Sequence, residues 1–182
     1  MNFEEKTLSS KTVFSGHLLR VDVEQVETPM GTKASREIVK HPSAVGLIVV
    51  DDQGRLAIVK QWRSPLHDTI LEIPAGKVDD RDHGDPLVAA KRELNEETRL
   101  QAANLKKVCR CYSSPGFTDE YLTMFLATGV KPVEQKLPQD ADEKLALQWI
   151  SVKEGVQMIA DEEITDAKTI LAIYYLRGLR NE

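Results

Sequence analysis

One stretch of the chain, residues 73–99, places a strand end, a glycine, a polar loop and an acidic helix in a fixed order. Gly76 follows an apolar run that is typical of a strand end. The aspartate-rich segment Asp79–Asp85 favours neither a strand nor a helix. Its last residue, Asp85, and the following Pro86 predict a helix start, because aspartate is a good N-cap and proline suits the first helical position. Any fold of this chain must therefore lead a strand through a turn and a loop into this helix.

Three carboxylates crowd one side of the predicted helix, at Glu93, Glu96 and Glu97. Like charges one turn apart repel by roughly 0.2–0.5 kcal/mol per pair. A divalent cation would remove that repulsion, and Mg²⁺ prefers oxygen ligands that it shares between protein carboxylates and substrate phosphates. The alternative is a solvated acidic helix face whose charge is offset by Lys91 and Arg92.

Periodic apolar residues predict the remaining elements. Within the acidic helix, Leu87, Ala90 and Leu94 recur at helical spacing and are expected to pack inward. Asp51–Gly54 predicts a hairpin between two strands. Strands are expected at residues 18–26, 35–39, 44–50, 56–62, 70–73, 105–112, 121–128 and 146–150, and helices at 86–99, 152–161 and 166–179.

Length and composition set broad limits. The 182 residues, 41% of them hydrophobic, suit one compact domain with a short N-terminal extension. The net charge of −5 argues against nonspecific binding to nucleic acid or to an anionic membrane. No apolar run approaches the ~20 residues that span a bilayer, and the polar start Met1–Lys6 lacks the hydrophobic region of a signal peptide. We expect a soluble cytoplasmic protein.

The segment from Gly76 to Leu100 resembles the signature of the Nudix hydrolases, in which a glycine, a glutamate and an Arg-Glu-apolar-x-Glu-Glu-x-Gly-apolar run follow in order. Counting forward from Gly76 puts Asp82 at the position of the first glutamate, whereas counting back from Arg92 puts Gly84 there. The loop therefore carries two extra residues. Arg99 stands at the late glycine. The resemblance implies an α/β fold, the Nudix α/β/α sandwich with a mixed central sheet.

Three further segments resemble the ADP-ribose pyrophosphatases of this family, namely Ser114–Glu120, Arg36–Pro42 and Gln61–Pro65. In that subfamily a small N-terminal antiparallel sheet is exchanged between subunits and helps to build the adenosine pocket of a homodimer. The resemblance thus implies a β extension over residues 1–40, turning near residues 28–31, and a Nudix hydrolase domain over residues 41–182.

The resemblance also implies the metal ligands and a proton acceptor. Glu93, Glu96, Glu97 and the backbone carbonyl of Ala75 are expected to hold Mg²⁺, with Mn²⁺ as a possible substitute. Counting back from the strand that ends the acidic loop selects Glu143 as the catalytic base; the alternative is an acidic surface loop. Three other carboxylates remain candidates for the base, namely Asp142, Glu97 and Glu120.

Substrate contacts follow from the same resemblance. Arg36 and Arg63 match positions that grip the nucleotide, because a guanidinium pairs with phosphate and stacks on adenine. Either could instead be a surface arginine on a strand. Phe14 is either an adenine-stacking ring or a packing residue, and Glu72 is either a pocket residue or lies on the outward side of its strand. Glu120 is a candidate for a ribose contact or for support of a metal-bound water. Gly116, within the Ser-Pro-Gly run, completes the set.

The resemblance therefore implies Mg²⁺-dependent hydrolysis of the pyrophosphate bond of ADP-ribose to AMP and ribose 5-phosphate. One alternative keeps the reaction and changes the substrate to another nucleoside diphosphate sugar. The other is a catalytically weak nucleotide-binding or regulatory protein on a Nudix scaffold, in which Gly84 and Arg99 mark decay of the signature.

Overall fold

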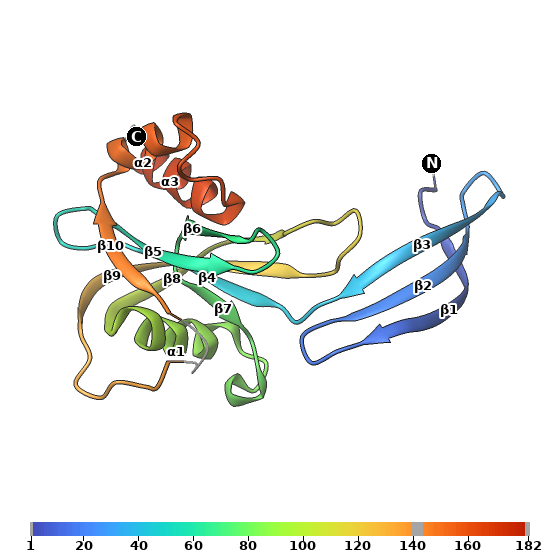
Figure 1. Cartoon of the computed structure of the whole chain (residues 1–182), viewed down its shortest axis with the longest axis horizontal. Helices are drawn as coiled ribbons and strands as arrows, with labels where there is room; N and C mark the ends of the chain where they lie inside the picture. Colours follow the sequence, from blue (N-terminus) through green and yellow to red (C-terminus); the bar gives the residue numbers. More distant parts are fainter. Residues whose placement is uncertain (1, 140–143, 181–182) are drawn as a thin grey trace. The chain divides into compact units, whose positions relative to one another are not determined.

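The computed structural model describes residues 2–139 and 144–180, which fall into two compact units (Figure 1). The first unit comprises Met1–Ala44 and Arg110–Leu122, and the second comprises Val45–Cys109 and Thr123–Glu182. No helix in the described part of the chain is long and apolar enough to cross a membrane.

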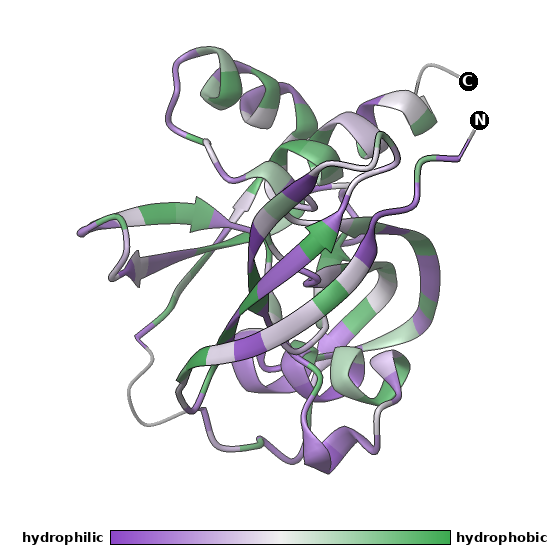
Figure 2. Cartoon of the chain, turned by 90° about the vertical axis from the view of Figure 1, so that its right-hand side faces the viewer, coloured by the Kyte–Doolittle hydropathy of each residue, from purple (hydrophilic) through white to green (hydrophobic). Residues whose placement is uncertain are grey.

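The first unit is built on an antiparallel sheet of three strands in the order β1-β2-β3. The strands are β1 (Lys6–Ser15), β2 (Arg20–Glu27) and β3 (Lys33–Lys40). The predicted turn between β2 and β3 is confirmed: Gly31 N–H donates to the Thr28 carbonyl oxygen at 2.8 Å, and Gly31 has φ +77°. Hydrophilic and hydrophobic residues are mixed along these strands in Figure 2. Every residue of β1 is exposed, which explains why no apolar periodicity predicted it.

Two sheets make up most of the second unit. One has the strand order β7-β4-β9-β8 and the other has the order β10-β5-β6. Strand β4 is buried along its whole length, as expected of a central strand covered on both faces. The bounds are β4 Ala44–Val49, β5 Leu56–Arg63, β6 Asp68–Glu72, β7 Ala75–Lys77, β8 Leu100–Tyr112, β9 Tyr121–Pro132 and β10 Ala146–Ile150.

The turn at Asp51–Gly54 forms as predicted, with Gly54 N–H donating to the Asp51 carbonyl oxygen at 2.9 Å. The two strands that it connects, however, enter different sheets, and an isolated antiparallel bridge joins Val50 to Leu56. The turn therefore passes the chain from one sheet to the other instead of closing an extended hairpin.

Helices cover both sides of these strands, with α1 (Pro86–Thr98) on one side and α2 (Val152–Ala160) and α3 (Ala167–Arg180) on the other (Figure 1). This arrangement confirms the predicted α/β/α sandwich. The Asp85 side chain accepts the Leu87 N–H at 2.8 Å, so the predicted start of α1 is also confirmed.

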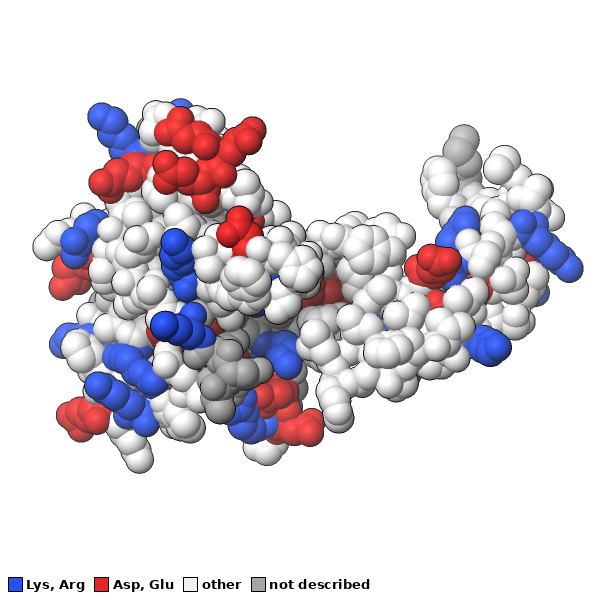
Figure 3. Space-filling model, in the orientation of Figure 1, with Lys and Arg blue, Asp and Glu red and all other residues white. Residues whose placement is uncertain are grey.

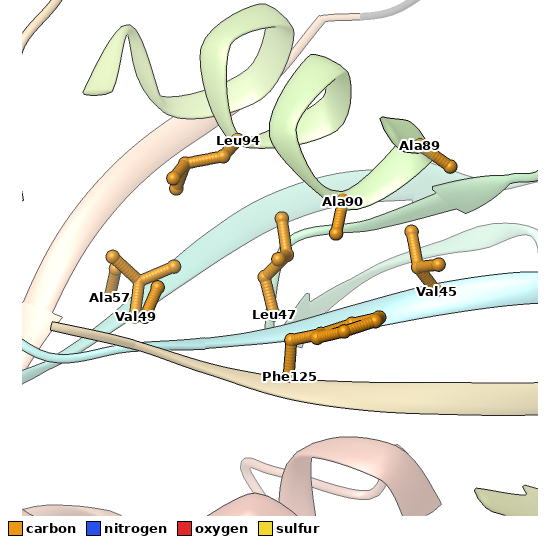
Figure 4. Packing of buried hydrophobic residues seen from close by; sticks show 9 residues of the cluster. Val45, Leu47, Val49, Ala57, Ala89, Ala90, Leu94 and Phe125 are labelled. Carbon is orange, nitrogen blue, oxygen red and sulfur yellow. The ribbon is translucent and has the colours of Figure 1, made fainter. Parts of the chain in front are cut away.

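Helix α1 packs onto the sheets through Leu94, Ala90 and Ala89, which lie against side chains of β4 and β9 (Figure 4). Leu94 is fully buried, and truncating such a side chain to alanine typically costs about 2–5 kcal/mol. The prediction that Leu87 packs inward was wrong: it is 37% exposed, and Ala89 fills the core position. The buried face fixes the helix rotation and hence the direction of its carboxylates.

The aspartate-rich loop contains a short 3-10 helix, η1 (Asp80–Asp82), where no regular structure was predicted. Asp79 accepts the Arg81 N–H at 2.8 Å, and the Asp82 carboxylate accepts the Asp79 N–H at 3.0 Å. These aspartates satisfy the backbone donors that a single helical turn leaves open. Their abundance is thus what allows the turn to form.

Candidate active site

The three predicted carboxylates lie on the inner side of α1. Glu93, Glu96 and Glu97 are only 8%, 6% and 6% exposed. Burying several like charges on one helix costs free energy unless each charge is compensated by hydrogen bonds or counterions. The burial rules out the alternative of a solvated acidic face.

Two of these carboxylates lie against strand β7. Glu97 Oε2 accepts the Ala75 N–H at 3.1 Å. A Cβ atom placed on Gly76 would lie 1.9 Å from Glu93 Oε1, which no side chain could tolerate. Glycine is therefore required at residue 76 to admit the Glu93 carboxylate, and the structure brings Ala75, Glu93 and Glu97 together.

Arg92 is the main counterion of this group. Its guanidinium donates to both oxygens of Asp82 at 2.9 and 2.7 Å, to Glu93 Oε1 at 2.7 Å, to Glu96 Oε2 at 2.8 Å and to the Lys77 carbonyl oxygen at 2.9 Å. The Asp82 carboxylate, followed by the charge of Glu93, raises the pKa of Arg92 above its usual range. Arg92 thus stays ionised and ties the loop to the helix.

The same contacts establish which residue takes the place of the first signature glutamate. Asp82 is fully buried and forms a bidentate ion pair with Arg92, whose hydrogen bonds hold the pKa of Asp82 below its usual value against the effect of burial. A Cβ atom placed on Gly84 would meet no atom within 4 Å, so this position faces open space. His83 and Gly84 both have left-handed backbone conformations, with φ +51° and +76°, so the extra residues form a turn between Asp82 and α1.

The donor chemistry of this group fits a hard divalent cation. Glu93, Glu96 and Glu97 supply carboxylate oxygens, and the backbone of Ala75 lies beside them. Among the described residues no three His, Cys, Asp or Glu side chains are already arranged as a metal cage. Arg92 binds one oxygen of Glu93 and one of Glu96, and Arg81 lies 3.3 Å from the other Glu96 oxygen, so an incoming cation competes with these guanidinium groups.

A second ion cluster surrounds Glu72, which is only 2% exposed at the end of β6. Arg63 Nε and Nη2 donate to its two oxygens at 2.5 and 2.9 Å, and Lys168 of α3 donates to Oε2. Burial alone would raise the pKa of Glu72, but Arg63 and Lys168 together hold it below its usual value. Two predicted substrate residues are therefore joined, and Glu72 is not on the outward side of its strand.

The start of α3 is fixed to the strand that leads into β7. Asp166 accepts the hydroxyl and the N–H of Thr169 at 2.6 and 2.9 Å, and its other oxygen binds Lys168 at 2.9 Å. The Thr169 hydroxyl oxygen in turn accepts the Ile73 N–H at 2.7 Å. Helix α3 thus holds both Glu72 and the backbone two residues before Ala75.

The other predicted substrate residues belong to the first unit. Arg36 and Gly116 line one groove of about 670 Å³, in which Glu5 Oε1 lies 2.5 Å from the Arg36 guanidinium. Phe14 is half-exposed and does not line this groove; its ring instead covers Gly16. Glu120 Oε1 lies 3.1 Å from His41 Nδ1.

Two of the candidates for the catalytic base, Glu143 and Asp142, lie outside the described residues. Of the other two, Glu97 belongs to the carboxylate group on α1 and Glu120 belongs to the first unit.

Charged side chains on the face shown in Figure 3 are mixed, and acidic groups gather around the α2 and α3 end of the second unit.

The sequence reasoning missed the roles of Arg92 and Lys168. The signature contains Arg92, but only the fold shows that it reaches Asp82 across the loop. No local signal could have found Lys168, because it lies 96 residues from Glu72 along the chain.

Comparison with known proteins places these features in context. The family profile "NUDIX domain" matches residues 40–172, and "Nucleoside diphosphate sugar hydrolase N-terminal domain" matches residues 5–39. The chain is 42% identical over 176 residues to the ADP-ribose pyrophosphatase of Bacillus subtilis (strain 168), covering 97% of this chain and 94% of the relative. It is 38% identical to the methanol dehydrogenase activator of Bacillus methanolicus, covering 96% and 94%. A crystal structure of an ADP compounds hydrolase has the same fold, with a TM-score of 0.86 at 20% identity, covering 98% of this chain and 96% of that one.

Proposed function

Because this chain belongs to the Nudix hydrolase family, we propose that it hydrolyses the pyrophosphate bond of ADP-ribose to give AMP and ribose 5-phosphate. The observation that carries the proposal is the set of three buried glutamates on α1, two of which lie against Ala75 and Gly76. A relative 42% identical over nearly the whole chain and named an ADP-ribose pyrophosphatase supports the choice of substrate.

Glu93, Glu96, Glu97 and the Ala75 carbonyl would hold Mg²⁺, for which Mn²⁺ could substitute. When bound, such an ion offsets the charge of a diphosphate and lowers the pKa of coordinated water. Arg92 donates hydrogen bonds to Glu93 and Glu96 and so holds these carboxylates in place. Asp82 anchors Arg92 from the loop, so it supports the site without acting as a metal ligand.

The base that accepts a proton from the attacking water is assigned to Glu143, with Asp142, Glu97 and Glu120 as the other candidates. A carboxylate near the reacting phosphorus suits this role, because general bases must reach the proton that they remove. Replacing Glu143 by glutamine should then lower kcat more than it changes KM.

The nucleotide half of the substrate, including its phosphate groups, is assigned to Arg36 and Arg63. Phe14 is assigned as an adenine-stacking ring, Gly116 as part of the Ser-Pro-Gly run, Glu120 as a ribose contact and Glu72 as a pocket residue. Arg36 is already bound to a carboxylate in its groove, which indicates that this guanidinium can take an anionic or stacking partner. We assign residues 1–40 to a β extension exchanged within a homodimer and residues 41–182 to the hydrolase domain.

A substrate panel tests the proposal. The purified protein is incubated with Mg²⁺ and ADP-ribose, GDP-mannose, UDP-glucose or NADH, and released nucleotide is measured. Preference for ADP-ribose supports the proposal, and preference for another nucleotide sugar overturns the substrate assignment alone. Binding without turnover on any substrate would favour a regulatory role, which the name of the Bacillus methanolicus relative makes worth testing.

A further inference from the structure

Lys168 gives Glu72 a second cation. The Glu72 carboxylate is 2% exposed and meets the Arg63 guanidinium on both oxygens and the Lys168 ammonium on Oε2. Asp166 also forms an ion pair with Lys168, with 2.9 Å between Oδ1 and Nζ. Two acids and two bases therefore form one cluster drawn from β5, β6 and the start of α3.

The two cations differ in their access to solvent. The Arg63 side chain is 37% exposed, whereas Lys168 is 17% exposed and faces Glu72 and Asp166. Arg63 can therefore meet a ligand from solvent, while Lys168 serves the buried carboxylates. Leaving a buried carboxylate without a counterion costs free energy. If Arg63 were the only cation beside Glu72, it could bind a second anion only by weakening its interaction with Glu72.

We propose that Lys168 is a positioning residue that compensates Glu72 and so allows Arg63 to bind the diphosphate of the substrate. The inference rests on the proposed function, because it takes the anion at Arg63 to be the diphosphate of ADP-ribose. Lys168 itself does not touch the substrate. Its contribution reaches the ligand through Glu72 and Arg63.

Removing the Lys168 charge leaves Glu72 with Arg63 as its main counterion. Glu72 then competes more strongly with the diphosphate for the Arg63 guanidinium. We expect Lys168→Met to weaken diphosphate binding about tenfold, which corresponds to about 1.4 kcal/mol. The value of kcat should change less than about twofold, because this interaction is the same before and during the chemical step.

The experiment is a double-mutant cycle on Arg63→Met and Lys168→Met, with Lys168→Arg as the conservative variant. Lys153→Met, at an exposed lysine in the first turn of α2, is the matched control. ADP affinity is measured by titration calorimetry with Mg²⁺, and kcat and KM are measured on ADP-ribose. Urea unfolding and circular dichroism establish that each variant is folded.

The inference predicts a tenfold loss in Lys168→Met, near-normal binding in Lys168→Arg and in the control, and no further loss when Lys168→Met is added to Arg63→Met. Normal ADP affinity in Lys168→Met, or an equal loss in both backgrounds, would overturn it. An Arg63→Met variant with unchanged ADP affinity would overturn it too. Absence of ADP-ribose turnover in the unmodified protein would instead refute the proposed function, and the ADP titrations would still decide the role of Lys168.

Discussion

Two buried ion clusters in the second unit differ in their balance of acidic and basic groups. Around Arg92, two guanidinium groups (Arg92 and Arg81) face four carboxylates (Asp79, Asp82, Glu93 and Glu96), so acids outnumber bases among these residues. Around Glu72, a single carboxylate binds Arg63 and Lys168, and among the described residues Asp166 makes the numbers of acids and bases equal. The first cluster retains negative charge that a cation can neutralise. The second is compensated without a ligand and holds a partly exposed guanidinium in place.

Removing one acid from the unbalanced cluster should give the largest effect. Glu93→Gln keeps the shape of the side chain but loses a charged oxygen ligand. We expect kcat with Mg²⁺ to fall by about 10²–10³-fold, the range for losing one preorganised electrostatic contact. Glu163→Gln, at an exposed acid between α2 and α3, is the control. Steady-state kinetics showing ordinary turnover for Glu93→Gln would end the assignment of this cluster to metal binding.

Removing the central base of the same cluster should affect folding. Arg92→Gln leaves Asp82, Glu93 and Glu96 facing one another without their guanidinium partner. Losing one member of a buried ion pair costs about 3–5 kcal/mol. Urea unfolding measures the change. A loss below about 1 kcal/mol would show that water or Arg81 replaces Arg92 easily, and that the cluster is less demanding than its geometry implies.

Removing the central acid of the balanced cluster should cost less. Glu72→Gln leaves two cations, but Arg63 is partly exposed and Lys168 keeps Asp166. We expect a loss of about 1–3 kcal/mol, the usual range for an unsatisfied buried hydrogen-bonding partner. The same urea titration compares it with Arg92→Gln. If Glu72→Gln proves the more destabilising of the two, the contrast between the clusters is reversed.

Acid should weaken the Arg92 cluster. Arg92 holds the pKa of Asp82 below its ordinary value of 3.8, against burial, so the folded state favours the ionised form. The stabilisation is therefore complete above about pH 4 and is lost as pH falls through the lower folded pKa. Unfolding free energies between pH 7 and pH 3 should decline less steeply in Asp82→Asn than in the unmodified protein. Parallel curves would indicate that other carboxylates dominate acid unfolding.

A change outside both clusters should have the smallest effect. Arg99 ends α1 with φ +62°, a left-handed conformation that glycine adopts without strain, and its guanidinium donates to the Leu137 carbonyl oxygen. Arg99→Gly should relieve about 1 kcal/mol of backbone strain and lose a hydrogen bond of similar value. We expect a net change within about 1 kcal/mol by urea unfolding and normal kcat. A severe loss would mean that the arginine has replaced the family glycine for a catalytic reason.

The sequence was sufficient for features that follow from local chemistry. Asp85 and Pro86 predicted the start of α1, and the spacing of Glu93 and Glu97 predicted that they share one side of the helix. It was insufficient where a segment has no apolar pattern, as in the fully exposed β1. It also could not decide between Asp82 and Gly84, because only burial and the contact with Arg92 distinguish them.

Long-range contacts were equally inaccessible. The pairing of Lys168 with Glu72 joins a helix near the end of the chain to a strand in its first half. Neither residue has a neighbour in the sequence that indicates the other. The assignment of Glu143 remains a prediction, as do the exchanged β extension and the homodimer.

The contact between Thr169 and Ile73 has a consequence for synthesis of the protein. Residues 73–97 leave the ribosome well before α3, yet the backbone beside Ala75 depends on a hydroxyl from that last helix. A nascent chain halted before Thr169 would contain the signature in full but not the hydrogen bond that fixes its first strand. Hydrolytic activity should accordingly require α3 as well as the signature itself.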